Sequence, residues 1–255
     1  MEKKKIVAII QAHMGSSRLP GKIMRDLCGM PALYRMIERV RLCKNVDEIV
    51  VATSRMKCDD EIIEACEQWG VPTFRGSDHD VLARYWGATQ AYPAEGYVRL
   101  TSDCPAIDPW GLDDLIRFFW EHTYRFVSVE MQTHIDGCWS YEIFTAELMN
   151  ETYEKAVEGY EREHVTPYMY TKQPSWHRVP CRFDGSGYRV TLDTPEDYAL
   201  IKSVFEALYP KNPCFTVDDI VAYLDAHPEI CRINADIAAI HFTQCSYDNF
   251  DDEEL

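Results

Sequence analysis

The chain has 255 residues, of which 42 are acidic and 26 basic, and its formal net charge is -16 at pH 7. This charge argues against a nucleic-acid-binding protein, because phosphate backbones require a basic surface. The ten cysteines form no CxxC pair and no metal-ligand spacing, so we expect reduced thiols in a cytoplasmic protein. No apolar stretch approaches the roughly eighteen residues of a membrane helix, and no membrane segment is expected.

Strands and helices alternate along the first half of the chain. The apolar run at 6–10 predicts a buried strand of a parallel sheet, and a loop rich in Gly, Ser and Pro follows it. Strands that alternate with helices of this length indicate right-handed crossovers and a mainly parallel sheet. Further strands are predicted at 48–53, 71–74, 96–101 and 126–131, and helices at 59–69, 80–92, 109–121 and from Pro31 onward.

Beyond residue 131 the regular alternation of strands and helices ends. We interpret residues 132–176 as an insertion in a single domain of residues 1–255, and its aromatic side chains favour a homodimer contact or an acceptor segment. The acidic residues 246–255 are expected to form a flexible tail. The predicted fold is a single Rossmann-like, three-layer α/β/α domain. In this half, strands are predicted at 141–144, 178–183 and 188–192, and helices at 147–157, 163–171, 195–208 and 217–226.

The loop after the first strand has the composition of an anion site. Gly15 lets the backbone approach a ligand, and Ser16 and Ser17 add hydroxyl donors. Arg18 offers a planar fork to a phosphate, and Lys22 offers a point charge. Ligands of open α/β sheets bind beyond the carboxyl ends of the strands, where this loop lies. The loop therefore predicts a nucleoside triphosphate site without Walker spacing; the alternative is an ordinary strand–helix turn.

Two aspartates follow predicted strands far apart in the sequence. Asp103 follows the strand at 96–101 and should lie at its carboxyl end, and Asp193 precedes the helix that Thr194 caps. Carboxylates at such positions suit Mg²⁺, which prefers hard oxygen ligands. A turn or helix cap remains the alternative for Asp103. Asp193 has no structural role of its own, which favours the metal role.

The sequence resembles a known enzyme family in three of these motifs. They are IIQAHMGSSRLPGK at 9–22, YVRLTSDCP at 97–105 and DTPED at 193–197. Together they resemble the SpsF-like cytidylyltransferases, which are related to CMP-KDO and CMP-sialic acid synthetases. The resemblance implies transfer of CMP from CTP to an acidic sugar or similar small anionic acceptor, with release of pyrophosphate, in cell-surface polysaccharide or glycoconjugate biosynthesis. It also implies a homodimer, bound Mg²⁺, and a nucleotide-diphospho-sugar transferase type of fold.

The resemblance also assigns roles to individual positions. Arg18, Lys22 and Asp103 are expected to be catalytic, and Asp103 and Asp193 to bind the metal. The motifs RGSDHDVLAR at 75–84 and EREHVTP at 161–167 suggest acceptor contacts from Arg84, Glu163 and His164, although a capped helix and an exposed helix start explain the two motifs equally well. The expected nucleotide-binding residues are Gln11, Ala12, His13, Met14, Gly15, Ser16, Ser17, Arg18, Lys22, Arg75, Ser77, Asp80, Thr101 and Ser102.

Two departures from the family pattern leave alternatives open. The family usually has arginine where this chain has His13, and Cys138-Trp139-Ser140 interrupts the region that the family uses for the acceptor. A relative that binds nucleotide without catalysis is therefore one alternative. A glycosyltransferase of similar fold is another, but it should carry an Asp-x-Asp motif, and Cys104-Pro105 follows Asp103 here.

Overall fold

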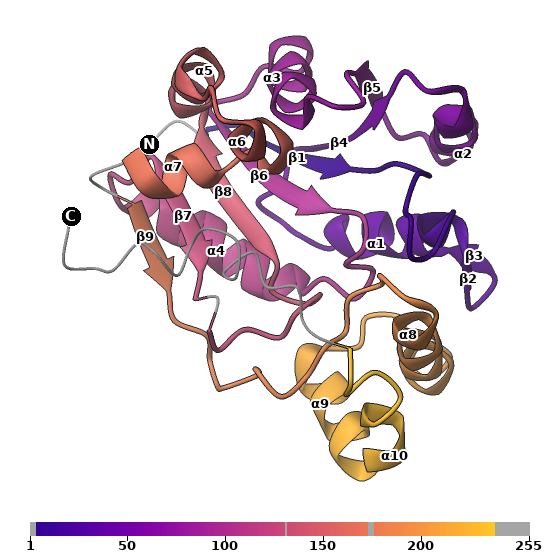
Figure 1. The fold of residues 1–255 in the computed structure, drawn as a ribbon. Coiled ribbons are helices and arrows are strands. Elements are labelled where there is room, and N and C mark those ends of the chain that lie inside the picture. Colours follow the sequence, from indigo (N-terminus) through magenta and orange to yellow (C-terminus); the bar gives the residue numbers. More distant parts are fainter. Residues whose placement is uncertain (1–3, 131, 173–175, 238–255) are drawn as a thin grey trace.

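Seven strands form one central sheet in the computed structural model, which describes residues 4–130, 132–172 and 176–237 (Figure 1). They are β1 (Ile6–Gln11), β4 (Glu48–Ser54), β5 (Thr73–Gly76), β6 (Gly96–Thr101), β7 (Phe126–Val129), β8 (Tyr141–Thr145) and β9 (Trp176–Val179). Their order is β5-β4-β1-β6-β8-β7-β9, and only β8 runs antiparallel to its neighbours. The mainly parallel sheet predicted from the sequence is thus confirmed. A separate two-stranded ribbon pairs β2 (Asp26–Leu27) with β3 (Met30–Pro31).

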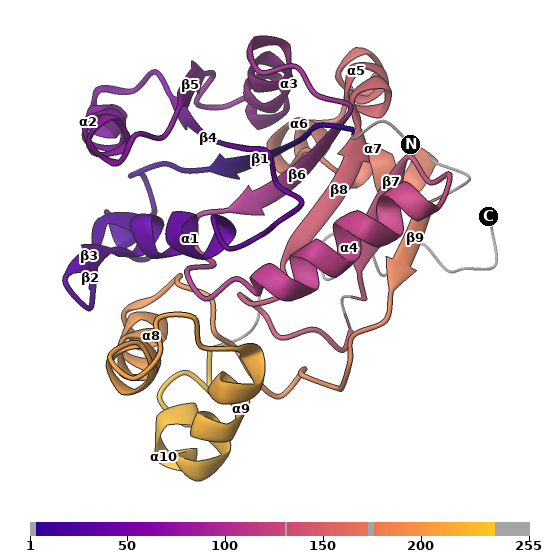
Figure 2. The same cartoon turned by 180° about the vertical axis from the view of Figure 1, so that it is seen from behind.

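Helices cover both faces of the sheet, which gives the predicted three layers (Figures 1 and 2). The helices are α1 (Ala32–Val40), α2 (Asp60–Trp69), α3 (Val81–Ala91), α4 (Pro109–Glu121), α5 (Ala146–Lys155), α6 (Gly159–His164), α7 (Pro167–Lys172), α8 (Pro195–Leu208), α9 (Val217–Ala226) and α10 (Pro228–Cys231), with short 3-10 turns η1 (Lys22–Met24) and η2 (Lys57–Asp59). Helices α3, α5, α6 and α7 lie over one face, and α1 and α4 lie over the other. Helices α8 to α10 form a group beside α1 and α4.

The first strand explains how one run of apolar residues supports two cores. Ile6, Ala8 and Ile10 belong to the core under α1, α4 and α8, whereas Val7 and Ile9 belong to the core under α3 and α5. All five side chains are fully buried. Burial on both faces is what a continuous apolar run predicts for a central parallel strand. The strand therefore fixes its carboxyl end, and the loop that follows, at the centre of the sheet edge.

The helix predicted at 163–171 is wrong as a single element. The chain forms α6 and α7, and Val165 between them has a left-handed φ of 74°. Thr166 donates its backbone N–H to the carbonyl of His164 across this residue (2.9 Å), which closes a tight γ-turn. Pro167 follows, and a residue before proline disfavours the α conformation, so Thr166 cannot continue a helix.

The strand predicted at 188–192 is also wrong. Only one isolated bridge, between Asp136 and Arg189, is formed. The segment instead crosses the carboxyl edge of the sheet, where Leu192 donates its backbone N–H to the carbonyl of Asp103 (2.8 Å). Gly137 allows this approach, because a Cβ there would lie 2.5 Å from the backbone of residue 190 and its φ is +91°. The strand predicted at 178–183 is the shorter β9.

Residues 132–176 contribute β8 to the central sheet and α5 to α7 to one face, as far as the structure describes them. Of the aromatic side chains that favoured a dimer contact, five are buried within this chain: Trp139, Tyr141, Phe144, Tyr168 and Tyr170. These five side chains therefore supply no surface for a partner, and the homodimer stays a prediction that light scattering can check. Among the helices of the described ranges, none combines the length and apolar character that a bilayer span requires. The predicted tail at 246–255 lies outside the described residues.

Candidate active site

The loop after β1 is held in place by a buried carboxylate. Asp59, which is 1% exposed, accepts the backbone N–H of Met14 (2.8 Å) and the hydroxyls of Thr53 (3.1 Å) and Ser54 (2.6 Å). Burial works against ionisation of Asp59, but these hydrogen bonds outweigh it and lower the pKa. Sequence reasoning treated Asp59 only as the start of a helix. Its actual role is to attach the loop to the end of β4.

The end of the loop directs a lysine toward two carboxylates. Gly21 adopts φ +65°, and the chain then turns through η1, so that Lys22 extends back across the sheet edge. Its Nζ lies 3.0 Å from Oδ2 of Asp103 and 2.8 Å from Oδ1 of Asp193. The Lys22 side chain is 8% exposed. The two aspartates predicted to share a site, 90 residues apart in the sequence, therefore face one cation-sized point.

Asp103 lies at this point because β6 ends beside β1. Ser102 donates its backbone N–H to the carbonyl of Gln11 (3.0 Å), and the Asp103 carbonyl accepts from Leu192, so the turn is held from both sides. Burial opposes ionisation of the Asp103 carboxyl, but the Lys22 ammonium and further hydrogen bonds hold its pKa at about 2. The carboxylate is therefore ionised at neutral pH.

The depressed pKa of Asp103 predicts a pH dependence of stability. A folded-state pKa of about 2, below the ordinary 3.8, stabilises the fold fully above pH 4, and this stabilisation is lost as the pH falls toward 2. We expect the free energy of unfolding of wild-type protein to fall across this window by about 1–2 kcal/mol more than that of Asp103→Asn. Urea unfolding at a series of pH values measures this difference. An equal fall of the free energy of unfolding with pH in the two proteins would contradict the prediction.

An arginine that the sequence analysis did not single out clamps Asp193. Arg189 lies 2.9 Å from Oδ2 of Asp193 through Nη2, and it also contacts Asp136 (2.8 Å) and Asp197 (3.1 Å). Asp197 is fully buried, and the same carboxylate accepts the backbone N–H groups of Asp193 and Thr194, both at 3.1 Å. One oxygen of Asp193 is thereby fixed, and the other is left facing Lys22.

Arg18 completes the ring of cations around Asp193. Its Nη2 lies 3.1 Å from the same Oδ1 that contacts Lys22. The Arg18 side chain is 41% exposed, so it reaches this carboxylate from the solvent side of the loop. Both cations predicted for the phosphates thus lie together at the sheet edge, as expected from the motif. Each is placed next to carboxylates rather than free in solution.

A second arginine is buried without obvious compensation. Arg84, on the first turn of α3, is 2% exposed, and within the part of the chain that the structure describes its Nε and Nη1 have no hydrogen-bond partner. Gly76 allows α3 to pack this closely, because a Cβ there would lie 2.8 Å from the Cβ of Arg84. The buried Oε1 of Gln11 likewise has no partner in the described ranges. Such atoms usually await a ligand or water.

His13 lies between these two groups of charges. Its pKa is lowered, first by burial and then by the positive charges of Lys22 and Arg84, against the opposing pull of Asp59. The imidazole is therefore neutral at pH 7. The permanent charge that the family usually carries at this position is not replaced here by a protonated histidine.

Arg75 has a local structural role. Its Nε and Nη2 donate to the carbonyls of Ser54 (2.9 Å) and Met56 (2.9 Å), and its Nη1 donates to Asp60 (2.6 Å). These bonds fold the segment after β4 against β5. Arg75 shapes the loop that leads to Asp59, and its binding of nucleotide stays a prediction.

Ser77 and Asp80 form the start of α3. The Ser77 hydroxyl accepts the backbone N–H of Asp80 (3.0 Å), and the Asp80 carboxylate accepts that of Ala83 (2.8 Å). Asp80 also pairs with Arg162 of α6 at 2.5 Å. The alternative of a capped helix is thus confirmed for Asp80, and the pair ties α6 to α3.

The γ-turn between α6 and α7 carries the second predicted acceptor group. Glu163 is exposed and His164 is half-buried. Burial lowers the pKa of His164, and the positive charge of Arg99 on β6 adds to the effect. Arg99 pairs with Glu142 (2.8 Å), which also accepts the hydroxyl of Thr166 (3.0 Å). His164 therefore lies within electrostatic reach of Arg99.

Trp139, one of the residues that depart from the family pattern, is a core residue. Its side chain is 3% exposed, and its Nε1 donates to Oδ2 of Asp108 at 2.9 Å. Cys138 is fully buried. Trp139 is therefore a packing residue, and both side chains are buried away from solvent.

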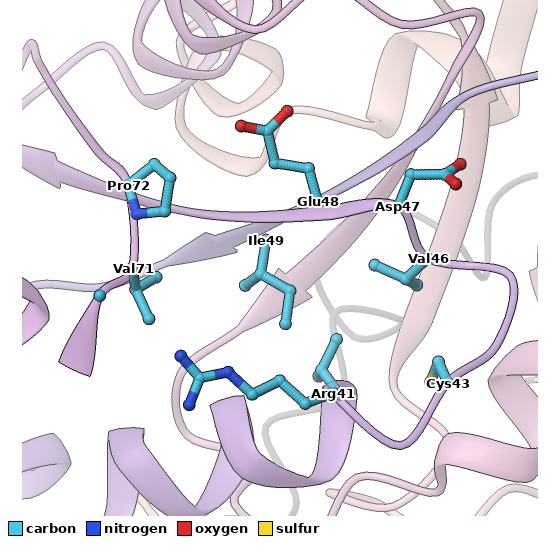
Figure 3. A pocket seen from close by; sticks show the side chains of 10 residues that line it. Arg41, Cys43, Val46, Asp47, Glu48, Ile49, Val71 and Pro72 are labelled. Atoms are coloured by element: carbon cyan, nitrogen blue, oxygen red, sulfur yellow. The ribbon is translucent and has the colours of Figure 1, made fainter.

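A surface hollow lies away from this site. It is lined by the end of α1, the start of β4 and the residues before β5 (Figure 3). Asp47 and Glu48 line it at the amino end of β4, whereas the loop after β1 is attached through Asp59 to Ser54 at the carboxyl end. No predicted site residue contributes to its lining, so the hollow is separate from the cluster of Lys22, Asp103 and Asp193.

The fold and the sheet edge together define a class of protein. A mainly parallel sheet with a cation-bearing loop after its first strand, and two aspartates beside that loop, is the arrangement of an α/β nucleotidyltransferase. The family described as cytidylyltransferase matches residues 7–212 of this sequence. The chain belongs to this family and is a CTP-dependent nucleotidyltransferase.

Individual relatives agree with this assignment. The spore coat polysaccharide biosynthesis protein SpsF of Bacillus subtilis is 33% identical over 234 residues, which cover 88% of this chain and 95% of that protein. The structure of a cytidylyltransferase from Leptospira borgpetersenii is 34% identical and superimposes with a TM-score of 0.84 over 89% of this chain and 97% of that one. A 3-deoxy-manno-octulosonate cytidylyltransferase of Nitratidesulfovibrio vulgaris is 33% identical over 132 residues, about half of each chain (48% and 49%).

Proposed function

We propose that this enzyme transfers CMP from CTP to an acidic sugar or a similar small anionic acceptor and releases pyrophosphate. The observation that carries the proposal is the convergence of Lys22, Asp103 and Asp193 at the end of the phosphate loop. The kinship with SpsF and with a 3-deoxy-manno-octulosonate cytidylyltransferase supports an acidic sugar and a role in cell-surface polysaccharide or glycoconjugate biosynthesis.

The carboxylates at this point fit a magnesium ion. Asp103 and Asp193 are 27% and 17% exposed, both reach one cation, and both are hard oxygen donors. Within the described residues no group of three or more His, Cys, Asp and Glu side chains could hold a metal. Two carboxylates suit Mg²⁺, which is usually held by one or two carboxylates and substrate phosphates. When bound there, Mg²⁺ would neutralise charge on the phosphate oxygens.

The residues of this chain then perform positioning and charge stabilisation. The loop backbone from Ala12 to Ser17 would hold the triphosphate against the end of β1. Lys22 and Arg18 would stabilise the charge on the departing pyrophosphate as the acceptor oxygen attacks the α-phosphorus. Asp59 holds the loop in place, and Arg189 holds Asp193 in place. Little reorganisation of these groups is therefore needed during the reaction.

Arg84, His164 and Glu163 are proposed to contact the acceptor. Arg84 has two buried donors without a hydrogen-bond partner among the residues that the structure describes, and such donors suit the carboxylate of an acidic sugar. Burial lowers the pKa of His164, so it would contact the acceptor as a neutral hydrogen-bonding group.

Release of pyrophosphate tests the proposal directly. Wild-type enzyme with CTP, Mg²⁺ and a panel of sugar acids should release pyrophosphate with at least one acid and form the CMP conjugate. The same panel with ATP, GTP and UTP measures nucleotide preference. Tight binding of CTP with no product from any acid would instead favour a nucleotide-binding relative without catalysis.

Arg84→Met separates a binding role from a structural one. Removing a buried, unpaired charge should leave the free energy of unfolding of the ligand-free protein unchanged or raise it by about 1 kcal/mol. The KM for the acceptor should rise at least about tenfold, because the anion loses its charged partner. Arg117→Met, at an arginine that is 61% exposed, is the matched control. A destabilised variant with an unchanged KM would show that Arg84 only supports the fold.

A further inference from the structure

Lys22 occupies the point where the two carboxylates meet. Its ammonium lies 3.0 Å from Asp103 and 2.8 Å from Asp193, and only 8% of the side chain is exposed. Its backbone N–H donates to the carbonyl of Leu19 (3.1 Å), and its own carbonyl accepts from Arg25 (3.2 Å), so the base of the side chain is fixed in the turn. The flexible stem alone decides where the charge lies.

Both carboxylates already have cationic partners without a metal. Oδ1 of Asp193 faces both Lys22 and Arg18, and its Oδ2 faces Arg189. A divalent cation placed between Asp103 and Asp193 would meet the Lys22 ammonium at close range, in a poorly hydrated site, where like charges repel strongly. Lys22 and the metal therefore compete for the same two carboxylates.

A triphosphate on the loop offers Lys22 another anionic partner. Arg18 and Lys22 both follow the loop backbone at residues 12–17, and both are long side chains that can rotate toward it. If both turn to the phosphates, two positive charges leave the carboxylates. A single Mg²⁺ brings back the same charge, and the phosphates supply the ligands that the two carboxylates lack.

We propose that Lys22 is a stand-in cation that fills the metal position in the free enzyme and yields it only when nucleotide phosphates draw the lysine away. This inference rests on the proposed function, because it assumes that Asp103 and Asp193 hold the metal. Its consequence is that metal binding depends on nucleotide. The free enzyme has low affinity for the metal alone, and the metal and the nucleotide bind together.

Titration with Mn²⁺ in the absence of nucleotide tests this idea. MnCl₂ is added to full-length protein, and the free ion is measured by electron paramagnetic resonance. Lys22→Met and Lys22→Gln should bind Mn²⁺ at least about tenfold more tightly than wild type, because both remove the competing charge. Lys22→Arg keeps the charge and should show no such gain. Adding Asp103→Asn to Lys22→Met should abolish the gain, which locates the ion at this pair.

Thermal unfolding provides a second readout that does not need a fully stable variant. Mn²⁺ should raise the Tm of Lys22→Met more than that of wild type, because a ligand stabilises the state that binds it. Equal Mn²⁺ affinity and equal Tm shifts in wild type, Lys22→Met and Lys22→Gln would overturn the proposal. Pyrophosphate release by wild type tests the proposed function separately, and its failure would leave the Mn²⁺ comparison unchanged.

Discussion

Asp103→Asn is expected to lower kcat/KM for CMP transfer by about a thousandfold, because a neutral amide would hold neither Mg²⁺ nor its bound phosphates in place. The loss should appear mainly in kcat, since the loop after β1, which we propose to hold CTP, is unchanged. Steady-state pyrophosphate release at saturating CTP measures the effect. Asp114→Asn is the matched control, because its side chain is 67% exposed and pairs with Arg117, which is 61% exposed.

The structure also sets the outcome that would contradict this expectation. The Asp103 carboxylate is one of two partners of Lys22, so the variant should still fold around the remaining pair with Asp193. A variant with native Tm and nearly wild-type kcat would show that Asp103 is only a turn residue. This was the alternative that the sequence left open.

The second large effect is expected on stability. Arg189→Met leaves the carboxylates of Asp136, Asp193 and Asp197 without their shared cation, and the fully buried Asp197 cannot be rescued by water. Removing one partner of a buried ionic network typically costs about 3–5 kcal/mol. Guanidinium unfolding should therefore show a loss of this size in the free energy of unfolding.

Arg117→Met is the control for this comparison. Arg117 is 61% exposed and pairs with Asp114, which is 67% exposed, so its loss should change stability by less than about 0.5 kcal/mol. If the two variants unfold at the same denaturant concentration, Arg189 does not hold the carboxylates as we infer.

The sequence predicted those features whose cause is local. The apolar run at 6–10, the polar loop after it and the aspartate after β6 each depend on neighbouring residues, and the structure confirms where they lie. Thr194 was predicted as a helix cap, and its hydroxyl accepts the backbone N–H of Asp197 at 3.2 Å. Capping and hydrophobic periodicity operate over a few residues, which is why a pattern can reveal them.

Features that depend on distant partners could not be predicted. Arg189 looks like one residue of an alternating strand, and only the fold reveals that it faces three carboxylates. The strand prediction at 188–192 failed because this segment bonds to loops at the sheet edge rather than to a strand. Asp59 reads as the start of a helix, and its contact with Met14 spans 45 positions. The positive φ of Val165 has no local signal beyond Pro167.

The segment that crosses the sheet edge has a consequence for how this enzyme becomes active during synthesis. Asp103 is made early, but its partner Asp193 arrives about 90 residues later, and Arg189 and Asp197 are further braced by Asn234, near the end of the described chain. Contacts between residues so far apart form late in folding. A nascent or truncated chain that ends before residue 234 could complete its sheet and still lack a finished catalytic centre. We therefore expect catalytic activity to be a measure of how completely the chain has folded.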